Sequence, residues 1–210
     1  MIARPPLFLP LLALTALLVL AVPVLTDWVP LHRADRALSE TFRGYGDHRP
    51  GLVSALRILT DVAATIPFLA AGGLAALTLL ARGRRAAAVF CATVTGTVPV
   101  LWGLAHWLLH RPRPLDGFVT VTSNGFPSGH TSNAAAAALV VVLLAWPRLA
   151  RTGRLVVVTA ATAFAVFVGL TRVALLAHWP TDVLGGWLLA LVVVPLVAYA
   201  VRERAPARAG

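Results

Sequence analysis

The chain alternates between long apolar runs and short polar segments. Six apolar runs are candidate membrane spans, namely Leu7–Thr26, Leu52–Ala81, Ala86–Leu109, Thr131–Trp146, Leu155–Leu176 and Val183–Val201. Most of them approach or exceed the roughly 20 residues that cross a bilayer core. Each is predicted to be a helix, because a lipid-facing backbone must satisfy its own hydrogen bonds and no strand-like alternation occurs. We therefore predict an all-α membrane protein, a six-transmembrane-helix bundle that forms one domain over residues 1–210.

The first two apolar runs each have a feature that the others lack. The first could be a cleaved signal peptide, but Leu7–Leu25 is longer than a usual signal core and no clear small-residue cleavage site follows it. An uncleaved first span is therefore favoured. In the second run, which is apolar without interruption only from Val62, Arg57 and Asp61 stand one helical turn apart. At that spacing the two side chains can pair.

The polar segment Asp27–Pro50 carries a weaker apolar pattern. Leu31, Ala34, Leu38 and Phe42 recur at helical spacing. The pattern is typical of a short amphipathic helix that lies on the outer membrane interface. An ordinary polar loop is the alternative, and the sequence leaves both open.

Composition agrees with a membrane protein, since 59% of the residues are hydrophobic and the mean hydropathy is +0.82. The net charge is +10, and all 18 basic residues are arginine. A basic chain can indicate nucleic-acid binding, but the positions of these arginines indicate membrane topology instead, so no nucleic-acid partner is expected. The single cysteine, Cys91, lies in an apolar run, which excludes an internal disulfide framework.

Charge divides the polar connections into two sets. One set holds ten arginines and a single acid, Glu203; it comprises Arg4, Arg82–Arg85, Arg148–Arg154 and the tail that contains Arg202, Arg204 and Arg208. The other set holds eight arginines against seven acids; it comprises Asp27–Asp61, His110–Pro127 and Arg172–Asp182. The positive-inside rule places the first set in the cytoplasm. Both termini are then cytoplasmic, as six spans require, and residues 202–210 form a short basic cytoplasmic tail.

The residue types that can perform chemistry gather in the outer set. All six histidines lie in it or at adjoining helix ends: His32, His48, His106, His110, His130 and His178. Three clusters stand out, His106–Pro114, Pro127–His130 and Thr171–Asp182. The predicted topology brings all three to the same face of the membrane.

The second cluster, Pro-Ser-Gly-His, stands at the start of an apolar run. Pro127 ends any preceding helix, Ser128 can cap the next one, and Gly129 permits close approach of the backbone to a ligand. The first amides of the helix would then form an anion site with His130 beside it. A plain helix cap is the alternative interpretation.

The other two clusters supply cations and a second histidine. Arg111 and Arg113 lie in a stiff Pro-punctuated segment, and their guanidinium groups suit either a phosphate ligand or lipid head groups. Arg172 is a charge within an apolar run, which indicates function. Asp182 can orient His178, although it also suits the first turn of a helix that begins near Pro180. Together the clusters predict an anionic, phosphate-like substrate, one histidine that attacks phosphorus and one that protonates the leaving group.

With these residues the chain resembles the type 2 phosphatidic acid phosphatase superfamily of membrane lipid phosphatases. That family has Lys, six residues and Arg-Pro; then Pro-Ser-Gly-His; then Ser-Arg, five residues, His, three residues and Asp. Here Arg113-Pro114 completes the first motif and Pro127–His130 is the whole second motif. Thr171-Arg172, His178 and Asp182 fill the third motif at the family spacing.

The resemblance implies a role for each matching residue. His178 is the nucleophile that forms a phosphohistidine, Asp182 orients it, and His130 is the general acid. The phosphoryl group is bound by Arg113, Ser128, Gly129 and Arg172. Two positions depart from the pattern: Thr171 replaces a serine, and His106 stands where the family has its lysine. His106 is included as a phosphate ligand that is cationic only when protonated.

The predicted protein is a multi-pass lipid phosphatase of the plasma (inner) membrane, with its site on the extracytoplasmic face. It needs no cofactor or metal and acts on a polyprenyl (pyro)phosphate such as undecaprenyl pyrophosphate, on phosphatidic acid or on phosphatidylglycerol phosphate. A phosphotransferase with the same histidine chemistry is one alternative. A metal- or haem-binding membrane protein is the other, since His106 and His110 have ligand-like spacing on one helix.

Overall fold

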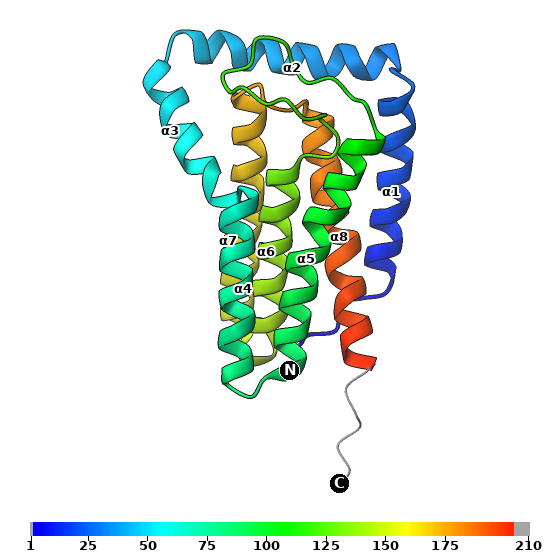
Figure 1. The fold of residues 1–210 in the computed structure, drawn as a ribbon, viewed down its shortest axis with the longest axis vertical. Helices are drawn as coiled ribbons and strands as arrows, with labels where there is room; N and C mark the ends of the chain where they lie inside the picture. The colour runs from blue at the N-terminus through cyan, green and yellow to red at the C-terminus, as the bar shows by residue number, and fades with distance from the viewer. Residues whose placement is uncertain (1, 204–210) are drawn as a thin grey trace.

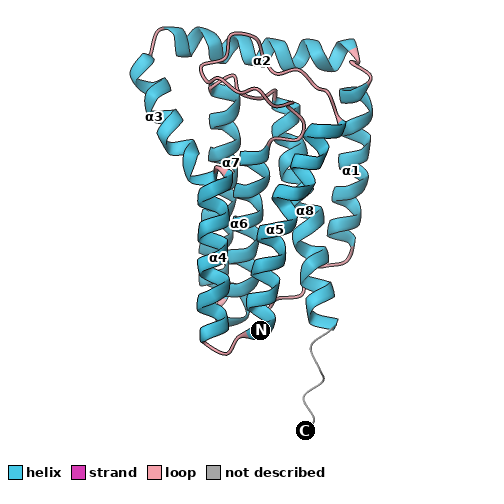
Figure 2. Ribbon diagram, viewed as in Figure 1, coloured by secondary structure: helices cyan, strands magenta, loops and turns pink. Residues whose placement is uncertain are grey.

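The computed structural model of the protein describes residues 2–203, which form a bundle of helices (Figure 1, Figure 2). The helices are α1 (Phe8–Leu25), α2 (Val29–Asp47), α3 (Pro50–Thr60), η1 (Asp61–Ala63), α4 (Thr65–Ala81), α5 (Arg85–Leu108), α6 (Gly129–Ala145), η2 (Trp146–Arg148), α7 (Arg151–Ala174) and α8 (Pro180–Glu203). The two labelled η are short 3-10 helices. Six stretches are long and apolar enough to cross a membrane, which confirms the predicted six-helix membrane fold.

The second predicted run is not one continuous helix. α3 and α4 are joined by η1 and by Ala64, whose ψ of 159° is extended. Pro67 explains the interruption, because its ring would clash with the carbonyl of Ala63 in a continuous helix and it has no amide hydrogen to donate. Beyond this break α3 leans away from the remaining helices (Figure 1).

The segment between the first two spans is helical, so the helix alternative for this region is confirmed. Helix α2 lies across one end of the bundle (Figure 1). The side chains that it buries are polar: Asp35 and Ser39 are 3% and 4% exposed, whereas Leu38 is 47% exposed. α2 is therefore docked through polar residues, while much of its apolar stripe stays on the surface.

Helix α6 packs against α4, α5, α7 and α8. Its close approach to α8 depends on Gly186. A Cβ atom at this position would lie 2.8 Å from the carbonyl oxygen of Ser128 and 2.9 Å from the Cβ of Thr131. Because glycine has no side chain, the start of α8 can lie directly beside the start of α6. This contact brings the second and third polar clusters together.

The N-terminal segment and the end of α8 lie together at the end of the bundle opposite α2 (Figure 1). Arg202 donates a hydrogen bond to the carbonyl of Ile2, and Tyr199 donates one to the carbonyl of Pro5. Both ends of the described chain are therefore on one side, as an even number of spans requires. The basic tail predicted for residues 202–210 lies, after Glu203, outside the described residues.

Candidate active site

The three polar clusters meet at the end of the bundle that α2 covers. His106 lies in the last turn of α5, His130 in the first turn of α6, and Asp182 in the first turn of α8. His178 lies between α7 and α8; it and Asp182 are 2% and 0% exposed. Helices far apart in the chain thus place the residues predicted from sequence in one buried site.

The geometry around His178 defines the tautomer of its ring. Its Nδ1 lies 3.4 Å from Oδ2 of Asp182, and its Nε2 lies 2.8 Å from Nη1 of Arg113. A guanidinium nitrogen can only donate, so Nε2 accepts and the ring proton sits on Nδ1, toward the carboxylate. Oδ2 of Asp182 is itself held by the amide of Trp179 at 2.9 Å. Nε2 therefore presents a lone pair, which is the form that a nucleophilic histidine requires.

The surroundings keep His178 neutral. Complete burial lowers the pKa of His178 well below its usual value, and the positive charges of Arg113 and Arg172 lower it further. A histidine whose pKa is depressed stays deprotonated across the neutral range. The imidazole is thus available for attack without losing a proton first.

The end of α7 explains how Arg172 and His178 come to share a site. The amide of Ala177 donates to the carbonyl of Arg172 at 3.0 Å, and the amide of Leu176 donates to that of Val173 at 2.9 Å. This is the Schellman pattern of a helix C-terminus. The left-handed position is held by Leu176, at φ 51°, instead of the usual glycine. Leu176 is only 1% exposed, so burial of its side chain offsets the backbone strain.

Arg113 is anchored by the loop before α6. Its guanidinium donates to the carbonyls of Ser123, Asn124 and Ala177 at 2.6, 2.8 and 2.5 Å. Ser128 is fully buried, and its amide donates to the backbone carbonyl of Asp182 at 2.9 Å. The Ser128 amide is therefore occupied. The first three amides of α6, from Gly129 to Thr131, have no acceptor within the helix and remain suited to an anion.

A buried ion-pair network behind His178 was not foreseen from the sequence. Arg111 donates to Oδ1 of Asp182 at 2.5 Å and to Oδ2 of Asp35 at 2.6 Å. Thr181 joins both, accepting from Arg111 at 2.7 Å and donating to Asp35 at 2.6 Å. Arg111, considered above as a ligand for phosphate or head groups, instead pairs with two carboxylates. Asp35 had no local sequence signal, because its partners lie 76 and 146 residues away.

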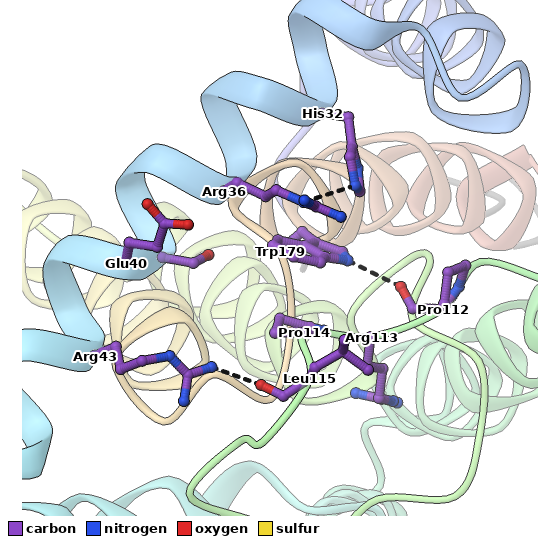
Figure 3. Close-up of a pocket in the computed structure, with 10 residues that line it drawn as sticks. His32, Arg36, Glu40, Arg43, Pro112, Arg113, Pro114, Leu115 and Trp179 are labelled. Carbon is purple, nitrogen blue, oxygen red and sulfur yellow. Dashed lines mark hydrogen bonds between the residues drawn. The ribbon is translucent and has the colours of Figure 1, made fainter.

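Helix α2 lies next to the Pro112–Leu115 segment, and its Arg43 side chain points toward Leu115 (Figure 3). Arg43 donates to the carbonyl of Leu115, and the indole of Trp179 donates to the carbonyl of Pro112 at 2.9 Å. A cavity of about 320 Å³ remains between α2 and this segment. The segment that carries Arg111 and Arg113 is thus held between α2 and the start of α8.

A second cavity, of about 440 Å³, opens beside His130 and Arg172. The residues that line it are Arg57, Thr60, Asp61, Phe118, Val119, Thr120, Val121, His130 and Arg172. The expected pairing of Arg57 with Asp61 is not formed. Arg57 donates to the carbonyl of Phe118, and Asp61 takes part in no ion pair within residues 2–203.

The two departures from the family motifs have different surroundings. Nε2 of His106 lies 2.7 Å from the carbonyl oxygen of Pro127, and its Nδ1 is buried without a partner within residues 2–203. The His106 ring packs against Trp102, with 5.2 Å between ring centroids. The hydroxyl of Thr171 lies 2.9 Å from that of Thr60 and so ties α7 to the end of α3. Phosphate binding by His106 stays a prediction.

Exchange of His106 tests that prediction. Nε2 of His106 donates its hydrogen to the carbonyl oxygen of Pro127. Nδ1 must therefore gain a proton before His106 can attract phosphate. His106→Gln is therefore expected to weaken inhibition by inorganic phosphate about tenfold at acidic pH and not at alkaline pH, whereas His106→Lys keeps tight binding at both. The exposed residue His110, changed to Gln, is the control. Equal inhibition of wild type and His106→Gln at both pH values would show that phosphate is held without His106.

The metal-binding alternative required His106 and His110 to share one face of a helix. α5 ends at Leu108, so His110 lies beyond it and is exposed while His106 is buried. Within residues 2–203, no group of three or more His, Cys, Asp or Glu side chains is placed to hold a metal ion. The pair therefore does not form the metal site that its spacing allowed.

Comparisons with known proteins identify the family and the fold. The sequence profile described as the PAP2 superfamily matches residues 86–206. Phosphatidylglycerophosphatase B of Bacillus subtilis (strain 168) is 39% identical over 98 residues, which are 45% of this chain and 47% of that protein, so the match spans about half of the relative's length. The crystal structure of a transmembrane PAP2 type phosphatidylglycerolphosphate phosphatase from Bacillus subtilis superposes with a TM-score of 0.77 at 26% identity, covering 95% of this chain and 98% of that one.

Proposed function

The chain belongs to the PAP2 superfamily, and from this premise we propose that it is a membrane lipid phosphatase that works through a phosphohistidine intermediate. The observation that carries the proposal is the orientation of His178. Its Nε2 lone pair faces Arg113, a phosphate-binding group, while Nδ1 faces the buried Asp182. His178 therefore contacts both the carboxylate that orients it and the cation that would bind the phosphoryl oxygens.

In the first step, Nε2 of His178 attacks phosphorus, and the bond between phosphorus and the leaving oxygen breaks. His130 donates its proton to that oxygen, so the lipid leaves with a neutral hydroxyl group in place of an alkoxide. Asp182 stabilises the imidazolium character that develops on His178. In the free site, Nη1 of Arg113 donates to Nε2 of His178. When substrate is bound, this donor instead binds a phosphoryl oxygen, and Arg172 and the α6 amides stabilise the charge on the other phosphoryl oxygens.

In the second step, water replaces the alcohol. His130, now neutral, takes a proton from the water as its oxygen attacks phosphorus, and the bond between phosphorus and Nε2 breaks. Inorganic phosphate is released, His178 regains its neutral form and His130 is again protonated. Neither step requires a metal ion or a cofactor.

We propose phosphatidylglycerol phosphate as the substrate. The names of both similar proteins support this choice over polyprenyl pyrophosphates and phosphatidic acid. The extracytoplasmic face is proposed for the site, with the plasma membrane as its location. The arginine-rich connections at the other end of the bundle, Arg82–Arg85 and Arg148–Arg154, support that orientation.

A phosphate-release assay in detergent tests the function. The purified protein is offered phosphatidylglycerol phosphate, phosphatidic acid and undecaprenyl pyrophosphate, and inorganic phosphate is followed directly, which separates hydrolysis from transfer to another acceptor. Release is expected to be fastest from phosphatidylglycerol phosphate. It should survive EDTA, because arginines and amides supply the positive charge, and vanadate should inhibit it. No release from any of the three lipids, or a strict need for magnesium, would refute the proposal.

A further inference from the structure

In the reaction proposed above, the leaving group would enter the cavity beside His130. His130 must lie within hydrogen-bond reach of the oxygen that it protonates. The atoms attached to that oxygen therefore lie in the 440 Å³ space that His130 shares with Arg172. The residues that line this space decide which leaving groups fit.

Much of the wall of this cavity is polar, although Phe118, Val119 and Val121 also line it. Arg57, Thr60 and Asp61 contribute from the end of α3 and from η1, and Thr120 contributes from the facing loop. Arg57 is exposed, and its one hydrogen bond within residues 2–203 goes to the carbonyl of Phe118. That bond fixes one end of the guanidinium and leaves other N–H groups for a ligand. Asp61 is also exposed and free of ion pairs within the described residues.

A different cavity, between α6, α7 and α8, provides a contrast. It measures about 340 Å³ and is lined by aliphatic side chains, Trp187 and a single hydroxyl residue, Thr162. Hydrocarbon fits such a wall. A hydrocarbon chain attached directly to the leaving oxygen would instead lie against Asp61 and Arg57 and displace water from both charges, which is unfavourable.

We propose that Arg57 and Asp61 form a leaving-group subsite that selects lipids with a polar spacer and a second phosphate after the cleaved bond. Arg57 pairs with the phosphodiester, and Asp61 accepts a hydrogen bond from the hydroxyl of the glycerol spacer. The inference rests on the proposed function and narrows its substrate to phosphatidylglycerol phosphate and its chemical relatives. Phosphatidic acid offers neither group at these positions.

Two substrates with identical acyl chains test the role of Arg57. Arg57→Gln is expected to lower kcat/KM for phosphatidylglycerol phosphate about tenfold or more, since a charge-assisted hydrogen bond is lost. For phosphatidic acid the change should stay within about twofold. Arg57→Lys should retain part of the selectivity, and Arg33→Gln, an exposed arginine of α2 outside the cavity, should leave both substrates unchanged. Equal losses on both lipids, or no loss on phosphatidylglycerol phosphate, would overturn the subsite.

An analogue of phosphatidylglycerol phosphate without the spacer hydroxyl tests Asp61. Asp61→Asn is expected to reduce kcat/KM for the natural lipid about fivefold or more while leaving the analogue within about twofold. Parallel losses would show that Asp61 acts through Arg172 or the fold and not on the spacer. If the wild type releases phosphate from none of these lipids, the proposed function is refuted. If the wild type is active but the Arg57 and Asp61 variants lose activity equally on the matched lipids, only the subsite is refuted.

Discussion

His178→Ala is expected to lower the rate of phosphate release from lipid substrates by about four to six orders of magnitude, which is the usual effect of removing a catalytic nucleophile. The side chain is buried beside Asp182, and no other histidine in the described structure has its free lone pair against Arg113. Asp182 and the phosphate-binding groups would remain, so substrate binding should persist. The measurement is single-turnover phosphate release together with capture of labelled phosphoenzyme, which should form in the wild type and not in the variant.

The dependence of kcat/KM on pH in the acidic range is a second test of the role of His178. Burial and the nearby arginines depress the pKa of His178, so the ring remains deprotonated at pH values below the usual value for histidine. After correction for ionisation of the substrate, kcat/KM should therefore stay level below the usual titration point of histidine, near pH 6.5, before protonation of the nucleophile lowers it. His110→Ala, which changes an exposed histidine at the same end of the bundle, is the control. Near-normal turnover by His178→Ala would exclude the covalent mechanism.

Arg111→Gln is expected to cause the second large effect, on both stability and rate. Arg111 is 6% exposed and stands between two buried carboxylates, Asp35 and Asp182. Removing one member of a buried ion pair strands the other charge and destabilises a protein by about 3–5 kcal/mol. Asp182 would also lose the group that holds its Oδ1, and His178 would lose its orientation. Misplacement of a reacting group by about 1 Å reduces rate about 100-fold, and we expect kcat to fall by that amount.

The inhibition constant of vanadate distinguishes positioning from phosphate binding. Arg111 donates to carboxylates and not toward Nε2 of His178, so Arg111→Gln should leave vanadate inhibition within about threefold of wild type. The rate is normalised to the fraction of enzyme that forms phosphoenzyme, so misfolded protein does not enter it. Asp35→Asn keeps the pair of Arg111 with Asp182 and should be milder in kcat. A large rise in the vanadate constant with an unchanged kcat would make Arg111 a phosphate ligand.

Features that are local in the chain were predictable from the sequence alone. The six spans follow from hydropathy and length, since a bilayer imposes a minimum apolar length on every helix that crosses it. The candidate site follows from three short motifs, because His130, Arg172, His178 and Asp182 keep fixed spacings within them. Pro67 offered a local signal for the break between α3 and α4, although hydropathy alone joined them in one run.

Tertiary structure decided the features that depend on partners far apart in the chain. Hydrophobic periodicity indicated that residues near Leu38 form a helix, but it could not indicate that this helix docks through Asp35. That choice depends on Arg111, 76 residues away, whose buried charge requires compensation. The turn at Leu176 was equally hidden, because a leucine reaches a left-handed conformation only where burial of its side chain offsets the strain. The sequence by itself thus determined which groups are proposed to perform the chemistry. The packing of α2, α3 and α8 around these groups decided how they are oriented and what surrounds the leaving group. These contacts form only once the helices have assembled, so no local pattern in the sequence could indicate them.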